Sequence, residues 1–535
     1  MRPCQGRRGP GSAGELSLLR STAVFGSLTM VSRVLGLIRD VVIAGVFGSS
    51  AATDAFFVAF KIPNFMRRLF AEGAFSQAFV PVLSEYRNLH DRAAVRRLVA
   101  LASGTLLVIL LVLTVLAILA AEWLVLVFAP GFRTDPEQFA LTADMLRITF
   151  PYLLFVSLVA CAQGVLNTYG RFGPPAFAPV LLNLVLIASA WWWAPLFAEP
   201  IRALAVGVFV AGILQLALML PFLHRLGMLT LPRWGWRDSG VRRILKLMLP
   251  ALFGSSVAQI NLLVDTILAS FLITGSITWL YYSDRLVELP LGVFGVALGT
   301  VILPRLSGEH ARDAPEQFAR TLDWALRWAV LIAVPAALGL AVMAGPIMTT
   351  LFQYGQFGPG DARSASLSLI AYSLGLLGFI MVKVLAPGYF ARQDMVTPVK
   401  CAAVSMVCNM VLSVSVVLAL RDTAIGHAGL ALATGIAATV NAGLLFAGLR
   451  RSGVYRPLPG WGALLSRVLL AALIMAGALL VLVPELPVWL EHDLAGRVTG
   501  LSGWLLAAVG GYVAILWLSG LRPAALRERR LPGTE

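Results

Sequence analysis

Charge is scarce in this sequence: Asp, Glu, Lys and Arg make up 13% of the 535 residues, whereas hydrophobic residues make up 59%. A water-soluble globular protein does not carry so much apolar surface, so that class is excluded and a polytopic membrane protein is indicated. The formal net charge of +15 does not point to nucleic acid. The basic residues concentrate in short loops between apolar runs, where they set membrane topology. We therefore expect no nucleic-acid partner.

Residues for metal, redox and nucleotide chemistry are also few. The four cysteines show no metal-ligand or redox spacing, and the five histidines fall at the ends of apolar runs or in loops. No Walker motif occurs, and the longest polar loop, around residues 225–243, is too short for an ATP-hydrolysing domain. The sequence therefore predicts a transporter rather than an enzyme. Its driving force must be an ion gradient, the membrane potential or downstream consumption of the cargo.

Long apolar runs dominate the chain instead. The predicted membrane spans are 20–46, 51–83, 98–128, 139–167, 175–197, 202–223, 244–273, 277–304, 321–352, 366–390, 398–420, 426–449, 463–484 and 498–519. Basic residues alternate between the loops, with 27 on the side of the N-terminus and 5 on the other side. Because an excess of Lys and Arg marks cytoplasmic loops, both termini are expected in the cytoplasm.

An internal repeat divides the chain. Pro81 and Pro304 lie in similar motifs 223 positions apart, and Phe128 and Phe352 lie 224 apart. Spans 1–6 and 7–12 are therefore predicted to be two parallel copies of one six-helix bundle. The predicted segments are a disordered cytoplasmic N-terminus (1–19), an N-lobe (20–224), a cytoplasmic linker (225–243), a C-lobe (244–450), a C-terminal helix pair (451–521) and a cytoplasmic tail (522–535).

Charged residues inside the first two apolar runs are the strongest functional signal. Helical spacing places Asp54, Lys61 and Arg68 on one stripe, because they are seven residues apart. Arg33 and Asp40 form a similar stripe on the preceding run. A charge that faces lipid costs roughly 2.5–3.5 kcal/mol even on the mildest scale. These stripes are therefore predicted to line a wet cavity walled by protein.

The second copy repeats this chemistry. Asp284, Arg285 and Glu288 lie close together on one face of the predicted span 277–304. Internal salt bridges explain any single pair as well as a binding site does, and that alternative stays open. Most of the intramembrane cations are arginines, whose planar guanidinium matches phosphate oxygens. Residue type therefore favours a cargo that carries phosphate.

Four motifs are similar to those of the MurJ (MviN) lipid II flippases: SRVLGLIRD, ATDAFFVAFKIPNFMRRLFAEGAFSQAFVP, YYSDRLVELPLGVFGVALGT and KVLAPGYFARQD. The resemblance covers Leu16 to Leu521 and implies the fourteen-helix fold of the multidrug/oligosaccharidyl-lipid/polysaccharide exporters. It also implies a function. Lipid II, the undecaprenyl-diphosphate-linked disaccharide-pentapeptide, would cross from the cytoplasmic to the outer leaflet of the bacterial inner membrane by alternating access. The two extra C-terminal helices would form a groove for the polyprenyl tail.

The resemblance also implies roles for single residues. Arginines that match Arg33, Arg39 and Arg285 line a central cavity in that family and engage the diphosphate. The substrate-binding set expected on this basis and from the charge pattern is Arg33, Arg39, Asp40, Asp54, Lys61, Arg67, Glu72, Arg285 and Glu288. Some members bind a sodium ion between spans 7, 11 and 12. Asp265, Asn409 and Thr434 match that site, whereas Ser413 stands where those members have an acid. No other cofactor is expected.

Three other functions remain as alternatives. They are a flippase for another polyprenyl-linked oligosaccharide, a cation-coupled drug exporter and a non-transporting scaffold for cell-wall synthesis. An exporter of organic cations would place acids and aromatic residues in the cavity rather than arginines, and a scaffold would not need buried charges in both lobes. The expected partners are lipid II, membrane lipids and the cell-wall synthesis machinery.

Overall fold

The computed structural model describes the backbone of residues 11–521 and their side chains, apart from those of 11–25, 71–72, 251, 253–262 and 296. The predicted tail 522–535 and residues 1–10 of the predicted N-terminal stretch lie outside the described residues. The first helix, α1 (Gly11–Phe47), already begins at Gly11, so residues 11–19 are helical rather than disordered. Every regular element from 11 to 521 is a helix, which confirms the all-α prediction.

Ten helices of the described chain are long and apolar enough to cross a membrane, and the bent pair α15 (Pro359–Leu374) and α16 (Leu376–Phe390) brings the number to eleven. This number makes the protein a multi-pass membrane protein. The three further predicted spans, 20–46, 51–83 and 244–273, are helical but do not add to this number. The count of fourteen therefore stays a prediction.

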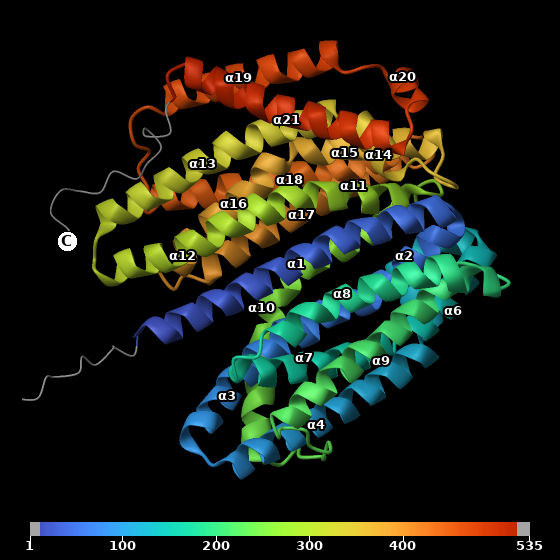
Figure 1. The fold of residues 1–535 in the computed structure, drawn as a ribbon, viewed down its shortest axis with the longest axis vertical. Helices are drawn as coiled ribbons and strands as arrows, with labels where there is room; N and C mark the ends of the chain where they lie inside the picture. Colours follow the sequence, from blue (N-terminus) through green and yellow to red (C-terminus); the bar gives the residue numbers. More distant parts are fainter. Residues whose placement is uncertain (1–10, 522–535) are drawn as a thin grey trace, which may run out of the picture. The chain divides into compact units, whose positions relative to one another are not determined.

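The chain forms two compact units, and the first is built largely from its N-terminal half. Unit 1 comprises Met1–Ile43, Ala55–Phe128 and Asp135–Gln259. Its elements are most of α1 and α2 (Ala51–Met66), η1 (Arg67–Phe75), α3 (Ser76–Leu89), α4 (Arg92–Leu119), α5 (Ala121–Phe128), α6 (Pro136–Thr149), α7 (Tyr152–Thr168), α8 (Gly173–Ala188), η3 (Ser189–Trp193), η4 (Ala194–Leu196), α9 (Arg202–Arg225) and the first part of α10 (Ser239–Ala269). Helices α7, α8 and α9 pack against one another in this unit (Figure 1).

Unit 2 comprises Ala44–Asp54, Ala129–Thr134 and Ile260–Glu535. Its further elements are η2 (Pro130–Thr134), α11 (Ser276–Pro290), η5 (Leu291–Gly295), α12 (Val296–Ala311), α13 (Pro315–Val342), α14 (Ala344–Phe352), α15, α16, α17 (Val396–Leu420), α18 (Gly426–Arg451), α19 (Trp461–Leu482), α20 (Leu486–Glu491) and α21 (Leu494–Leu518). We call Ala44–Asp54 tip 1 and Ala129–Thr134 tip 2. The units divide after Gln259 inside α10, so the predicted linker at 225–243 stays a prediction.

Element boundaries repeat along the chain as the sequence motifs do. Helix α4 (Arg92–Leu119) and helix α13 (Pro315–Val342) are both 28 residues long and begin 223 positions apart. Each is followed after one residue by a short helix, α5 and α14, and these also begin 223 positions apart. Because whole elements recur at the spacing of the matching prolines, the internal repeat is a repeat of structure as well as of sequence.

Two π-helical segments belong to the same repeat. Segment η1 begins at Arg67 and segment η5 begins at Leu291, which is 224 positions later. Each follows a proline inside an α-helix, Pro63 in α2 and Pro290 in α11. Proline removes one helical N–H donor, and a π-turn is one way in which the helix re-pairs its carbonyls. The predicted stripe from Asp54 therefore does not continue with α-helical spacing beyond Met66.

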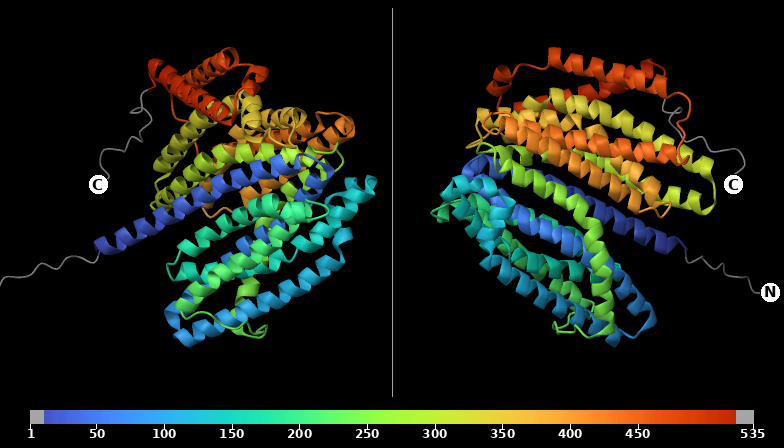
Figure 2. Two further views of the ribbon diagram at one scale, coloured as in Figure 1. Left: turned by 45° about the vertical axis from the view of Figure 1, so that its right-hand side comes forward. Right: turned by 180° about the vertical axis from the view of Figure 1, so that it is seen from behind.

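The C-terminal helix pair packs on α13 in unit 2, and α19 lies against both α13 and α21 (Figures 1 and 2). The buried carboxylate of Asp323 in α13 accepts hydrogen bonds from the Tyr455 hydroxyl at 2.7 Å and from the Trp461 indole at 2.7 Å. The Tyr512 hydroxyl of α21 donates to the Leu331 carbonyl of α13 at 2.9 Å. These polar contacts fix both helices of the pair to one helix of the repeat.

Candidate functional site

The predicted residues Arg39 and Asp40 form a buried ion pair in unit 1. Arg39 donates to one oxygen of Asp40 through Nε at 2.9 Å and Nη2 at 2.6 Å, and Nη1 donates to Asn183 Oδ1 at 3.0 Å. Both charged residues are at most 5% exposed. Asn183 in turn donates through Nδ2 to the carbonyl of Ser32 in α1 at 3.0 Å. Arg39 is thus engaged in a hydrogen-bonded ion pair of the kind that the salt-bridge alternative describes.

Asp54 caps a helix in unit 2. Its carboxylate accepts hydrogen bonds from the Gly275 amide at 2.7 Å, the Thr278 amide at 2.9 Å and the Thr278 hydroxyl at 2.6 Å. Gly275 precedes α11 in a left-handed conformation (φ 93°) and has no side chain with which to cap that helix itself. An acidic group at a helix N-terminus satisfies the unpaired amides and interacts favourably with the helix dipole. Asp54, which is 2% exposed, therefore has a structural partner.

A second carboxylate of unit 2, Asp361, was not among the predicted site residues. It accepts hydrogen bonds from the Ser49 hydroxyl, from the Trp279 indole at 3.2 Å and from the Gly358 amide at 3.0 Å. The short sequence Gly-Pro-Gly-Asp at 358–361 signals the start of a helix and hence the local cap. It gives no sign of the contact with Ser49, which lies 312 positions away.

Both tips are held in unit 2 by hydrogen bonds. The Gln356 amide donates to the Gly45 carbonyl of tip 1 at 2.9 Å. The Gly131 amide of tip 2 donates to the Ser270 hydroxyl at 3.1 Å. A Cβ atom on Gly131 would lie 2.1 Å from the Ser270 carbonyl oxygen, so the close approach requires glycine there. Together with Asp54 and Ser49, these contacts tie residues from the first quarter of the chain into unit 2.

Arg285 is more accessible than Arg39. Its guanidinium donates to Glu288 at 3.0 Å and to the Tyr281 hydroxyl at 3.1 Å, and it lies 5.1 Å from the centre of the Tyr281 ring. All three residues belong to α11, so the helix itself orients the guanidinium. The Arg285 side chain is 32% exposed and that of Glu288 is 44% exposed. The group is therefore oriented and still has surface with which to contact a ligand.

The other predicted residues of α1, α2 and η1 differ in their contacts. Arg33 is exposed, and its side chain makes no hydrogen bond or ion pair with any residue that the structure describes. Lys61 is half-buried in α2, and Arg67 donates to Asn64 Oδ1 at 2.8 Å. The predicted role of Glu72 concerns a side chain outside the described residues. Arg33 is thus a predicted arginine of unit 1 whose guanidinium is accessible to a ligand.

The predicted sodium ligands come together in unit 2. Asp265 accepts from Asn409 Nδ2 at 2.8 Å and from the Thr434 hydroxyl at 3.3 Å, and Ser413 Oγ lies 3.5 Å from Asn409 Oδ1. The set offers one carboxylate, one amide and two hydroxyls, which are the oxygen donors that hard cations prefer. Within the described chain no group of three or more His, Cys, Asp or Glu residues could hold a metal. One negative charge among neutral oxygens fits a monovalent ion better than a divalent one.

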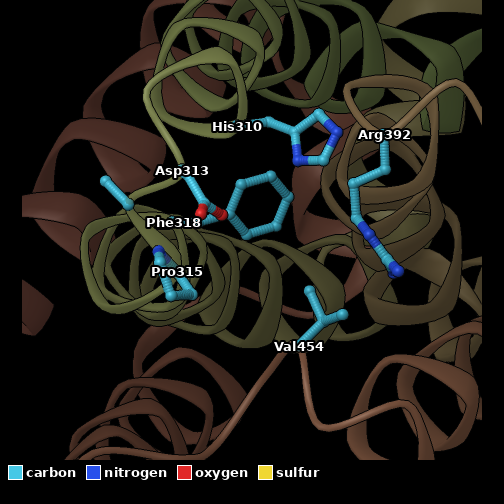
Figure 3. Close-up of a pocket in the computed structure, with 7 residues that line it drawn as sticks. His310, Asp313, Pro315, Phe318, Arg392 and Val454 are labelled. Carbon is cyan, nitrogen blue, oxygen red and sulfur yellow. The ribbon is translucent and has the colours of Figure 1, made fainter.

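A pocket of unit 2 contains none of the predicted site residues. Its volume is about 90 Å³, and it lies where the turns after α12 and α16 meet Val454. Figure 3 shows the side chains of His310, Asp313 and Arg392 placed around the ring of Phe318. The pocket therefore gives no support to the predicted site.

Comparison with known proteins identifies the family. The model of the family described as lipid II flippase MurJ matches residues 43–497. This chain belongs to the MurJ family. The probable lipid II flippase MurJ of Vibrio cholerae is 46% identical over 512 residues, which cover 94% of this chain and 97% of that protein. The lipid II flippase MurJ of Burkholderia cenocepacia is 42% identical and is covered over its whole length by 96% of this chain.

Solved structures agree with membership in the MurJ family. A structure of lipid II flippase MurJ in an inward closed conformation matches 94% of this chain and all of that protein, with a TM-score of 0.76 and 26% identity. A multidrug resistance MATE family transporter of the MOP superfamily, in an inward-facing conformation, matches with a TM-score of 0.64 and 15% identity, which shows the fold alone. The predicted exporter fold is thus confirmed, and a MurJ chain is a transporter rather than an enzyme.

Proposed function

We propose that this protein translocates lipid II from the cytoplasmic to the periplasmic leaflet of the bacterial inner membrane. The observation that carries the proposal is the match over nearly the full length to relatives named as lipid II flippases, at up to 47% identity. The intramembrane arginines support it, because lipid II carries a diphosphate and guanidinium groups bind phosphate oxygens in pairs. The proposal includes cytoplasmic termini, which the excess of basic residues in alternate loops supports.

Arg33 and Arg285 are the proposed diphosphate ligands. Each presents an exposed or part-exposed guanidinium, and Arg285 is already oriented by Glu288 and Tyr281. Arg39 has a different proposed role. Its guanidinium is committed to Asp40 and Asn183, so it orients the polar face of α1 and contacts the diphosphate only if that network rearranges. Arg33 and Arg285 thus bind in this scheme, and Arg39 positions.

The hydrogen bonds of the two tips are the proposed lock of one state in alternating access. Asp54 and Asp361 accept from groups at the N-terminal ends of α11 and α15 and from Ser49 of tip 1, and all of these acceptors and donors belong to unit 2. Release of the tips from unit 2 would accompany the opposite state. Because several hydrogen bonds break together, the transition is expected to be two-state rather than gradual.

A monovalent cation bound at Asp265 is the proposed source of coupling. The carboxylate would neutralise the ion, and the oxygens of Thr434, Ser413 and Asn409 would complete its surroundings. The three residues that surround Asp265 come from α17 and α18, whereas Asp265 itself comes from α10. Binding would therefore favour the arrangement in which these three helices are packed together.

The single experiment that tests the function is complementation. A bacterium depleted of its own lipid II flippase would express this chain, and the fraction of lipid II accessible from the periplasmic side would be measured. We expect the wild-type chain to restore that fraction and the double variant Arg33→Ala with Arg285→Ala to abolish it at equal expression. Arg421→Ala, an exposed arginine that pairs with the exposed Asp422, is the matched control and should restore it.

The runner-up, a flippase for another polyprenyl-diphosphate-linked oligosaccharide, shares the arginines and gives a different result. In that case lipid II would stay inside while the other precursor appears outside. The same measurement, made on both precursors, separates the two functions. A drug exporter is not favoured, because relatives that share more than 40% sequence identity with this chain are named as flippases. Partners in cell-wall synthesis remain part of the proposal only.

A further inference from the structure

A loop of unit 1 packs against the N-terminal half of the membrane-spanning helix α4. Residues 226–238 connect α9 to α10 and lie along α4, as the hydrogen bonds place them (Figures 1 and 2). The Arg233 amide donates to the Ala100 carbonyl at 2.8 Å, and the Gly235 amide donates to the Thr105 hydroxyl at 3.2 Å. A Cβ atom on Gly104 would lie 2.2 Å from the Arg233 carbonyl oxygen. Backbone therefore meets backbone here, and the loop has a fixed place on α4.

This fixed loop exposes large apolar side chains. Trp234 is 56% exposed, Trp236 is 46% exposed and Leu231 is 82% exposed. The two indole rings are nearly parallel, at 12°, with centroids 6.1 Å apart. The loop adjoins α4, the most apolar of the candidate spans, whose outward side chains are aliphatic. Tryptophan is enriched where an apolar span meets the polar headgroups, because its ring is apolar and its N–H is polar.

The same surface carries arginines without ionic partners. The acids near it are already engaged: Glu85 pairs with Arg243 at 2.8 Å, Asp91 caps α4 and Asp238 caps α10. The hydrogen bond from Arg243 lowers the pKa of Glu85, so this pair stays ionised at neutral pH. Five further arginines make no side-chain hydrogen bond or ion pair within residues 26–521 as described: Arg96, Arg97, Arg233, Arg237 and Arg242. The surface is thus positive and uncompensated by protein.

We propose that this surface, formed by Trp234, Trp236, Arg96, Arg97, Arg233 and Arg237 and called the tryptophan loop surface, binds the headgroups of anionic glycerophospholipids. The indole rings would lie at the level of the headgroups, and the guanidinium groups would contact lipid phosphates beside them. Charge decides the occupant, because a zwitterionic lipid leaves the arginines uncompensated whereas an anionic one neutralises them. Binding would hold the connection between α9 and α10 at the membrane surface.

The tryptophan loop surface differs from the proposed transport site in its ligand and in its location. It concerns a resident lipid of the surrounding leaflet rather than cargo, and it uses none of the predicted substrate residues. Its test therefore needs no transport measurement. The full chain would be placed in nanodiscs of phosphatidylcholine that contain either brominated phosphatidylglycerol or brominated phosphatidylcholine, and quenching of tryptophan fluorescence would be recorded. Bromine quenches a tryptophan only at close range.

The chain has 13 tryptophans, so the signal of the loop is the difference between the wild type and the variant Trp234→Phe with Trp236→Phe. We expect this difference signal to be quenched by brominated phosphatidylglycerol at low mole fraction and much less by brominated phosphatidylcholine. The variant Arg233→Gln with Arg237→Gln should need about ten- to thirty-fold more phosphatidylglycerol for the same quenching. The variant Arg451→Gln with Arg456→Gln removes the same charge elsewhere and should behave as the wild type.

Three results would overturn the proposal. The first is equal quenching by the two brominated lipids, which would reduce the loop to a general membrane contact. The second is an equal loss in the control variant, which would make the effect one of net charge. The third is displacement of phosphatidylglycerol by an equimolar amount of lipid II, which would assign the surface to substrate entry. Circular dichroism of each variant would verify that the fold is retained.

Discussion

At the scale of the residue, the structure separates the predicted arginines by what surrounds them. Arg39 neutralises the buried Asp40, whereas Arg285 pairs with the part-exposed Glu288. Removal of one partner of a buried ion pair costs about 3–5 kcal/mol, and removal of one partner of an exposed pair costs about 0–1 kcal/mol. The two arginines should therefore respond differently to truncation.

We predict that Arg39→Ala strongly destabilises the protein, whereas Arg285→Ala leaves its stability nearly unchanged and abolishes lipid II transport. Thermal unfolding of the purified variants and the complementation assay, measured side by side, check this. The double variant Arg285→Ala with Glu288→Ala adds a decisive comparison. If it restores transport, Arg285 only compensates Glu288 and does not bind the substrate.

Asp54 gives a second prediction about a single residue. Asp54→Asn keeps the shape of the side chain but turns one acceptor oxygen of the α11 cap into a donor that faces an amide. Loss of a helix cap costs about 0.5–2 kcal/mol, so a lower unfolding temperature is expected. The exposed Asp422→Asn is the matched control and should change the free energy of unfolding by less than about 0.5 kcal/mol. Equal shifts in both variants would contradict the capping role.

At the scale of the element, sequence patterns predict local structure well and long-range partners poorly. The repeat at 223 positions and the capping signal at 358–361 both reappear in the elements that form. The α-helical stripe through Asp54 and Lys61 fails beyond Met66, because the chain there turns into a π-helix. The Asn183 contact of Arg39 and the Gly275 contact of Asp54 span 144 and 221 positions. No periodicity encodes such separations, since they depend on tertiary packing.

The close contact between Gly355 and Gly45 of tip 1 leads to a prediction at the scale of the element. Gly355 has a positive φ of 56°, and a Cβ atom there would lie 2.1 Å from the Gly45 carbonyl oxygen. Gly355→Ala should therefore weaken the adjacent hydrogen bond from the Gln356 amide and speed hydrogen exchange in residues 44–54 at least ten-fold. Gly360→Ala, in the first turn of α15 where a Cβ atom would meet nothing within 4 Å, is the matched control. Unchanged exchange in Gly355→Ala would show that tip 1 does not need this approach.

At the scale of the whole molecule, the orientation in the membrane follows from the charge asymmetry of the loops. A ratio of 27 basic residues to 5 strongly favours cytoplasmic termini. We predict that a fluorescent reporter fused after Leu521 matures in the cytoplasm. We also predict that Gly360→Cys, in a background without native cysteines, reacts with a membrane-impermeant thiol reagent from outside. If the cysteine at this position is protected from the reagent, the predicted number of spans before residue 360 is wrong by an odd number.

Coupling to a cation is the second property of the whole molecule, because it links helices α10, α17 and α18. A ligand that binds only the folded state stabilises it by RT ln(1 + [L]/Kd), which gives about 1.4 kcal/mol at ten times Kd. We predict that sodium, but not an equal concentration of a bulky organic cation, raises the unfolding temperature of the wild-type protein. Asp265→Asn should abolish this stabilisation because it removes the only charged ligand of the set. Ser413→Asp, which introduces a second carboxylate, should tighten sodium binding.

Sodium binding can be measured without a transport assay, so the result distinguishes a cation site from a purely structural role of these residues. In the alternative interpretation Asp265, Asn409 and Thr434 form a hydrogen-bonded triad that only holds the three helices together. Asp265→Asn would then lower the unfolding temperature equally with and without sodium. A sodium-dependent shift that persists in Asp265→Asn would place the ion elsewhere, and coupling would have to be sought in the membrane potential. A shift that disappears only in the Asp265 variant would assign the ion to this carboxylate, since Arg421→Ala removes an exposed charge at the end of α17 that does not belong to the triad and should leave the shift intact.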